Sequence, residues 1–140
     1  MIKVIDIQNH ITKKLKDNFP SYDIRVEDNK QDISTPAFYV SVRPLLTTGE
    51  MKYKNKLVNV NIQYLSKKNT HQENLIMSEI LEDLFNLTLQ VYDRNLYIKD
   101  LSISELDKVL NLGFTLDYNV GKEIAVTNDY MRDLEIKGDD

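Results

Sequence analysis

The sequence contains few of the residues on which active sites and metal centres are built. Its 140 residues include no cysteine, two histidines and four glycines. Without cysteine the chain has no disulfide, no thiolate zinc ligand and no thiol nucleophile. The glycines, at positions 49, 113, 121 and 138, are too scattered to form a phosphate-binding loop or a dinucleotide-binding fingerprint. These absences exclude several classes of enzyme.

The two histidines are far apart in the sequence. His10 and His71 each lack a second potential ligand at helical or hairpin spacing, so we expect both to be surface or boundary residues. No Gly-x-Ser-x-Gly motif occurs, and the serines have no histidine near them in the sequence. We therefore predict that the chain is not an enzyme and has no cofactor, catalytic residue or metal site.

Long hydrophobic runs are also missing. No apolar run is longer than Ala37–Val40, whereas a membrane-spanning helix needs roughly 20 apolar residues. The first residues lack the apolar segment and cleavage site of a signal peptide. We expect no membrane partner and a protein that is made and kept in a cytoplasm.

The composition is that of an ordinary folded domain, with 41% hydrophobic and 29% charged residues. The length suits one domain, which we expect to span residues 1–120. Residues 121–140 contain Met131 and Leu134 among many charges. We interpret this segment as an extension that is partly flexible alone and can become ordered on a neighbour, which makes both residues candidate assembly contacts.

Charge is unevenly distributed along the chain. Residues 1–68 carry a net charge of +5 and residues 69–140 a net charge of −9, within an overall −4. One interpretation is that folding mixes the two halves and the asymmetry disappears. The alternative is a head-to-tail contact between copies, in which a basic surface meets an acidic one and the contacts close into a ring.

The spacing of apolar residues predicts an order of helices and strands. Val4, Ile7, Ile11 and Leu15 mark an amphipathic helix that ends near Asn18, because a proline at position 20 disfavours helix at Phe19. Strands are predicted over 22–27, 37–43, 51–65, 89–92, 96–103 and 109–120, the last of them central in the sheet. Pro44 is expected to close its strand, with a hairpin loop over 45–50.

A second helix is predicted to begin at Thr70, where Thr70 and Glu73 match a capping box. Its expected core stripe consists of Ile76, Met77, Ile80, Leu81, Leu84 and Phe85, and its expected water-facing residues are Asn74, Ser78, Glu79, Glu82 and Asp83. The predicted fold class is α+β, a mainly antiparallel sheet with two helices packed on one face.

Three lysines, Lys52, Lys54 and Lys56, alternate along the outer half of the 51–65 strand. Such a row usually protects a strand edge against unwanted pairing. The alternative is an assembly contact, or non-specific contact with DNA in the lumen of a ring, where nearby tyrosines could stack on bases. The acidic pI of about 5.2 argues against nucleic-acid binding as the main role.

Several short patterns, in order, resemble the tail terminator family of bacteriophage tails and phage-tail-like particles. They are Leu15–Pro20, Ile24–Asp28, Thr35–Val42, Val58–Tyr64, the Glu73–Phe85 helix and a late strand around Leu110–Tyr118. The resemblance covers roughly residues 4–120 and depends on no single diagnostic motif.

This resemblance implies a structural subunit of a ring, typically hexameric, that caps the tail tube and stops tail polymerisation. The implied partners are copies of itself, the tube protein, the sheath protein if the tail is contractile, and neck or collar proteins that join the head. The implied location is the host bacterial cytoplasm during assembly, and then the virion tail or a phage-tail-like bacteriocin. Another neck component, such as a head–tail connector or tail completion protein, is the alternative.

Overall fold

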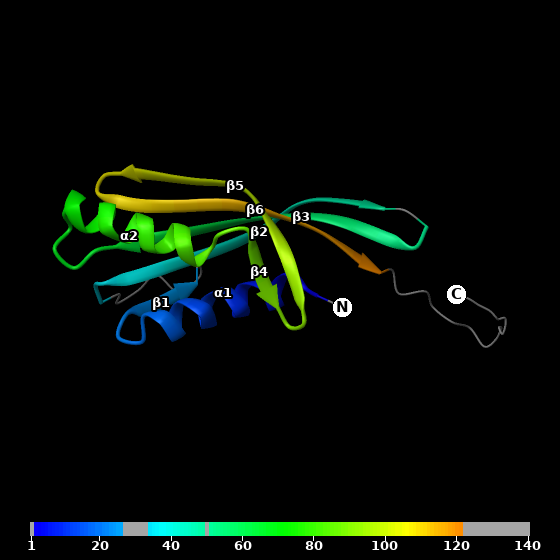
Figure 1. The fold of residues 1–140 in the computed structure, drawn as a ribbon, viewed down its shortest axis with the longest axis horizontal. Helices are drawn as coiled ribbons and strands as arrows, with labels where there is room; N and C mark the ends of the chain where they lie inside the picture. The colour runs from blue at the N-terminus through cyan, green and yellow to red at the C-terminus, as the bar shows by residue number, and fades with distance from the viewer. Residues whose placement is uncertain (1, 27–33, 50, 122–140) are drawn as a thin grey trace.

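The computed structural model describes residues 2–26, 34–49 and 51–121, which form two helices and six strands (Figure 1). In chain order these are α1 (Val4–Asn18), β1 (Asp23–Val26), β2 (Ala37–Gly49), β3 (Tyr53–Leu65), α2 (His71–Leu84), β4 (Thr88–Val91), β5 (Arg94–Leu106) and β6 (Val109–Gly121). The strands form one sheet in the order β1-β2-β3-β6-β5-β4. Only the β1–β2 pair is parallel, so the predicted α+β fold with a mainly antiparallel sheet is confirmed.

One hydrophobic core lies between the sheet and the two helices. In β6 the even-numbered residues from Leu110 to Val120 are buried and the odd-numbered ones are more open, which gives the sheet one dry face. α1 contributes Ile7, Ile11 and Leu15 to the core, as predicted, and all three are fully buried. Each such burial stabilises the fold by about 1.5–3 kcal/mol. β6 is hydrogen-bonded to β3 and β5, so its predicted central position is also confirmed.

β2 is longer than the sequence predicts. The strand does not close at Pro44 but continues to Gly49, through residues expected to form a loop. β1 pairs with β2 only as far as Val40, so Pro44 lies where β2 is an edge strand, and a register shift follows between Pro44 and Leu46. Edge positions and bulges are the places where a strand tolerates a residue without an N–H donor.

The buried face of α2 differs from the predicted stripe. Met77, Leu81 and Phe85 are buried as predicted, whereas Ile76 and Ile80 are 59% and 42% exposed, and Asn74, which was expected to face water, is buried. Asn74 is buried because its side-chain amide donates a 2.9 Å hydrogen bond to the carbonyl of Lys108 in the β5–β6 turn. This bond and the burial of Met77 in the core set the rotation of the helix about its axis. The apolar pattern alone does not determine that rotation, because Leu75, Ile76 and Met77 are consecutive.

The predicted capping box at the start of α2 is half formed. The Thr70 hydroxyl accepts a hydrogen bond from the Glu73 N–H at 3.3 Å, as predicted. The Glu73 carboxylate, however, accepts from the N–H of Lys68 at 2.9 Å instead of from Thr70. The helix is therefore still capped, and Glu73 also fastens the preceding loop.

The β4–β5 hairpin and its neighbour β6 also refine the prediction. Val91 pairs with Arg94, so the turn consists of Tyr92 and Asp93 and lies earlier than the predicted 93–95. The pairing of β5 with β6 has a register shift in β5 between Lys99 and Ser102, where Ser102 pairs with Gly113. The predicted extension, apart from Gly121, lies outside the described residues, as do residues 27–33. No described helix is long and apolar enough to span a membrane.

Candidate assembly surfaces

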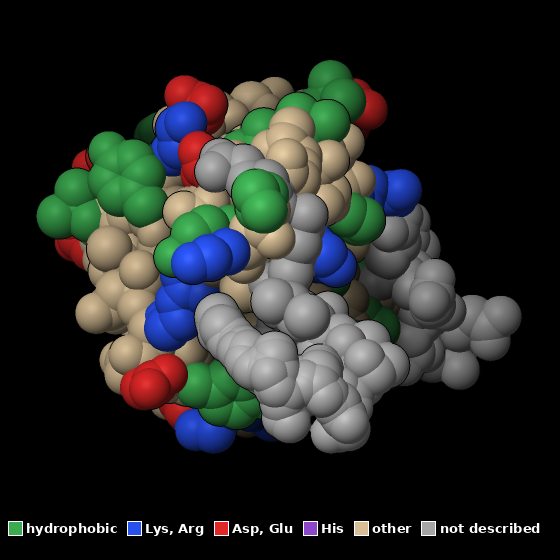
Figure 2. All heavy atoms as spheres, turned by 90° about the vertical axis from the view of Figure 1, so that its right-hand side faces the viewer, with side chains coloured by type: hydrophobic (Ala, Val, Ile, Leu, Met, Phe, Trp, Pro, Cys, Tyr) green, Lys and Arg blue, Asp and Glu red, His purple; other side chains and the backbone are tan. Residues whose placement is uncertain are grey.

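The β2–β3 hairpin projects from the body of the molecule. In Figure 1 its turn extends past the ends of both helices along the longest axis. We use "hairpin tip" for the described residues 45–49 and 51–56. Its large hydrophobic side chains are open to solvent: Leu45 is 58%, Leu46 53%, Met51 91% and Tyr53 52% exposed. Figure 2 looks onto this end and shows hydrophobic and basic side chains close together. Such a group of exposed apolar residues is typical of a contact surface.

The lysines of the hairpin tip occupy defined positions. Lys54 lies opposite Val120, and Lys56 lies between Thr47 and Tyr118. Alternate residues of a strand face the same side of the sheet, and Lys54 and Lys56 alternate with the buried Val58. Both lysines therefore lie on the side of the sheet that carries the helices, beyond the part that the helices cover. Lys52 precedes the strand, in a bend. The structure thus places two of the three predicted lysines on one face. None of the three has an ion pair within the described residues.

The second exposed apolar surface contains Ile76 and Ile80, which the sequence prediction placed in the core. This "α2 outer face" comprises Leu75, Ile76, Glu79, Ile80, Glu82 and Asp83, all exposed. Five of these residues, all except Glu82, line a depression of about 340 Å³. The signal that could have revealed this face is the run Leu75–Met77, because three consecutive apolar residues cannot all point towards one core. The other candidate contacts, Met131 and Leu134, lie outside the described residues.

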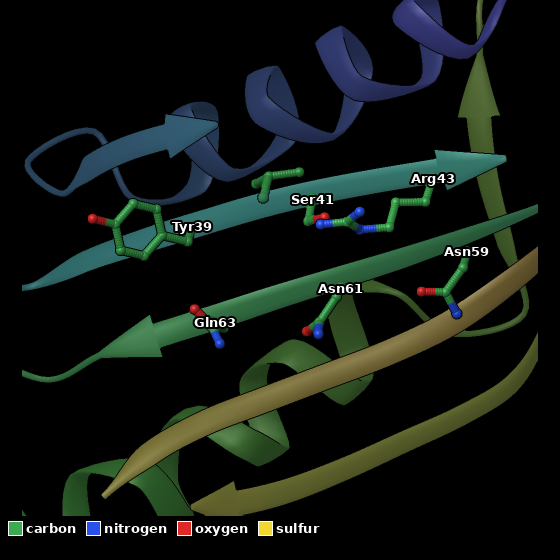
Figure 3. Close-up of a pocket in the computed structure, with 7 residues that line it drawn as sticks. Tyr39, Ser41, Arg43, Asn59, Asn61 and Gln63 are labelled. Carbon is green, nitrogen blue, oxygen red and sulfur yellow. The ribbon is translucent and has the colours of Figure 1, made fainter. Parts of the chain in front are cut away.

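The open face of the sheet is polar. Tyr39, Ser41 and Arg43 from β2 face Asn59, Asn61 and Gln63 from β3 around a depression of about 200 Å³ (Figure 3). Gln63 donates a 3.1 Å hydrogen bond to Asn111 of β6, which ties this row to the central strand. Among the described residues of the lining Arg43 is the charged one, and the others are polar or apolar, so this part of the depression contains no paired acid and base.

His10 joins α1 to the β4–β5 turn. Its Nε2 accepts a 3.3 Å hydrogen bond from the N–H of Tyr92, and its Nδ1 lies 2.8 Å from the carbonyl of Asp6. With Nε2 accepting, Nδ1 is the ring nitrogen that donates to this carbonyl. The rings of His10 and Tyr92 meet edge to face at 4.6 Å. This histidine therefore serves as a structural link.

Asp6 completes this contact. Its carboxylate accepts a 2.8 Å hydrogen bond from the N–H of Lys3 and a 3.0 Å bond from the Tyr92 hydroxyl. These bonds, that from Lys3 first, lower the pKa of Asp6 below its ordinary 3.8. The bond to Asp6 raises the pKa of the Tyr92 phenol.

His71 makes the second histidine contact, between α2 and β5. Its Nδ1 lies 2.6 Å from a carboxylate oxygen of Glu105. Across the described ranges, no group of three or more His, Cys, Asp or Glu side chains is placed to hold a metal ion.

Comparison with known proteins identifies one family. The sequence profile of the family described as "Phage tail terminator protein" matches residues 6–128. No curated protein matches the chain. Eighteen chains of solved structures do. One of them, whose name describes no activity, is 15% identical in sequence and has a TM-score of 0.48. The match covers 89% of this chain and 99% of that one. A likeness at this level carries no argument about function. Because the profile spans most of the sequence, the chain belongs to the phage tail terminator protein family.

Proposed function

We propose that this chain is the subunit of a ring that caps the end of a phage tail tube and stops its polymerisation. Membership of the family makes the chain a structural component of the phage tail that interacts with other tail proteins. The observation that supports a ring is the presence of two exposed apolar surfaces, the hairpin tip and the α2 outer face, at opposite ends of one sheet. A subunit with two different contact surfaces can build a closed ring of identical copies.

The same proposal extends to its partners. The ring would meet the tube protein on one side and present the other side to neck or collar proteins, with the sheath added in a contractile tail. A capping role needs complementary surfaces and no catalytic group, which agrees with the choice of residues on both surfaces. We place the protein in the bacterial cytoplasm during assembly and in the finished tail afterwards.

Deletion of the gene tests the role. Electron microscopy of the particles should show tubes that are abnormally long and variable in length, because nothing ends polymerisation. Supplying the wild-type chain in trans should restore a uniform length. Tails of normal length that are not attached to heads would contradict a terminator and support the alternative, a head–tail connector or tail completion protein.

A further inference from the structure

The hairpin tip and the α2 outer face are complementary in charge. The hairpin tip carries Lys52, Lys54 and Lys56, and the α2 outer face carries Glu79, Glu82 and Asp83. None of these six residues has an ion pair within the described part of the chain. α2 contains no lysine or arginine at all. Among their described residues, each surface therefore presents charge of one sign next to exposed apolar side chains.

The acidic residues of α2 lie where they weaken the isolated helix. Glu82 and Asp83 are in its last turn, which has no basic residue. The helix macrodipole places partial negative charge at this end, so carboxylates there are unfavourable and cations favourable. Lysines brought by another molecule would relieve this repulsion.

Exposed apolar area is concentrated in the same two places. More than half of the exposed large hydrophobic side chains of the described residues lie on them: Leu45, Leu46, Met51 and Tyr53 on the hairpin tip, and Leu75, Ile76 and Ile80 on the α2 outer face. On α2 these side chains line the depression of about 340 Å³ together with Glu79 and Asp83. An apolar centre with a charged rim is the usual composition of a protein interface.

The two surfaces cannot meet within one copy. Lys54 pairs with Val120 near the end of β6, while Asn74 of α2 bonds to the turn that precedes β6. With about 3.3 Å of rise per strand residue, these ends of β6 are more than about 30 Å apart. Figure 1 shows the hairpin and α2 at opposite ends of the sheet.

We propose that the hairpin tip of one copy docks on the α2 outer face of a second copy, with Met51 at the turn against Ile76 and Ile80, and the lysines against Glu79 and Asp83. This inference depends on the ring proposed above and names the surfaces that form its subunit contacts. The contact is heterologous, because each copy donates its hairpin to one neighbour and receives a hairpin from the other.

A disulfide trap tests the contact directly, because the natural chain has no cysteine that could react in the background. The variants Met51→Cys and Ile76→Cys are prepared separately, mixed and oxidised mildly. Both positions are more than half exposed, so neither substitution endangers folding. The mixture should form cross-linked heterodimers about tenfold faster than either variant alone.

A matched control replaces Ile76→Cys with Tyr97→Cys, since Tyr97 is 58% exposed and lies on β5 between the buried Leu96 and Ile98, so it faces the side of the sheet without helices. Mixing it with Met51→Cys should give only the slow background rate. Equal rates for the two mixtures would overturn the proposal, as would homodimers of Met51→Cys forming as fast as the heterodimer, which would indicate a symmetric tip-to-tip contact.

Charge reversal gives a second test in the uncross-linked protein. Variant A carries Lys52→Glu and Lys54→Glu, and variant B carries Glu79→Lys and Asp83→Lys. Each alone opposes like charges at every contact and should weaken self-association, measured by sedimentation at low salt, by about tenfold or more. In a mixture the tip of each variant faces opposite charge on the other, so association should return. Two variants that associate as the wild type does, or a mixture that remains monomeric, would refute the docking.

The length of the tail tubes tests the terminator role independently of the docking contact. If variant B ends tubes at normal length while deletion of the gene lengthens them, the chain is a terminator whose subunits meet through other surfaces. If deletion leaves tube length unchanged, the terminator role itself fails whatever the cross-linking shows.

Discussion

At the residue scale, the contact of Asp6 with Tyr92 joins segments more than eighty residues apart in the sequence. The pKa of Asp6 is lowered in the fold, first by the N–H of Lys3 and also by the Tyr92 hydroxyl. A lowered carboxyl pKa means that the stabilisation is present above the ordinary value of 3.8 and is lost as the pH falls through the folded value. For Tyr92 the pKa is raised, so its contribution is present below the ordinary 10.0 and lost as the pH rises through the folded value.

Removal of the Tyr92 hydroxyl should therefore matter in a defined pH range. We expect Tyr92→Phe to lower the free energy of unfolding between the two ordinary pKa values, 3.8 and 10.0. The difference from the wild type should shrink at lower pH, where Asp6 is protonated, and at higher pH, where Tyr92 is ionised. Urea unfolding across this range measures it. Tyr97→Phe, at an exposed position of β5, is the control and should show no such profile; a difference for Tyr92→Phe that stays constant with pH would contradict the assignment.

At the scale of the element, the rotation of α2 decides which residues become surface. Its sequence holds two overlapping stripes, one with Asn74, Met77 and Leu81 and the other with Ile76 and Ile80. The sequence prediction combined Ile76 and Ile80 with Met77 and Leu81 in one broad stripe and placed Asn74 in water. The structure buries the first, because Asn74 reaches the Lys108 carbonyl and anchors the helix to the β5–β6 turn.

Asn74→Ala should accordingly destabilise the protein by about 0.5–1.5 kcal/mol, since it removes the hydrogen bond from the buried Asn74 side chain to the Lys108 carbonyl. The midpoint of chemical denaturation measures this loss. Gln72→Ala, at an exposed position of the same helix, is the matched control and should change the midpoint little. Equal effects of the two substitutions would show that the amide bond does not hold α2 in place.

At the scale of the whole molecule, the uneven charge of the sequence becomes spatial at two surfaces. Basic residues gather at the hairpin tip and acidic ones on α2, at the other end of the sheet. The halves of the chain are nevertheless interleaved in the sheet, because β3 and β6 are neighbours. The charge asymmetry of the sequence is therefore found at the hairpin tip and on α2, whereas the two halves of the chain lie side by side within the sheet.

Reversal of charge at the hairpin tip should impair assembly of the tail. We expect Lys52→Glu with Lys54→Glu to give tubes of irregular length in electron micrographs, because the tip no longer fits an acidic neighbour. Lys56 is left unchanged because it is half-buried. The control is Lys67→Glu with Lys68→Glu, which changes the net charge by the same amount at exposed positions beyond the other end of β3. It should leave tube length normal. Normal tubes from the hairpin variant would exclude a role for these lysines.

The sequence by itself determined the fold class, α1 and its core residues, the central strand β6 and the family. The fold class, α1 and β6 follow from local periodicity, which is strong where one face is buried along a whole element, as from Leu110 to Val120. The family was indicated by the resemblance of several short patterns and is shown by the sequence profile over residues 6–128. Only the tertiary structure decided the extension of β2 past Pro44, the rotation of α2 and the placing of two apolar surfaces at opposite ends. Each of these depends on partners distant in the sequence: the absence of β1 beside Pro44, the Lys108 carbonyl against Asn74, and the sheet that separates the hairpin from α2.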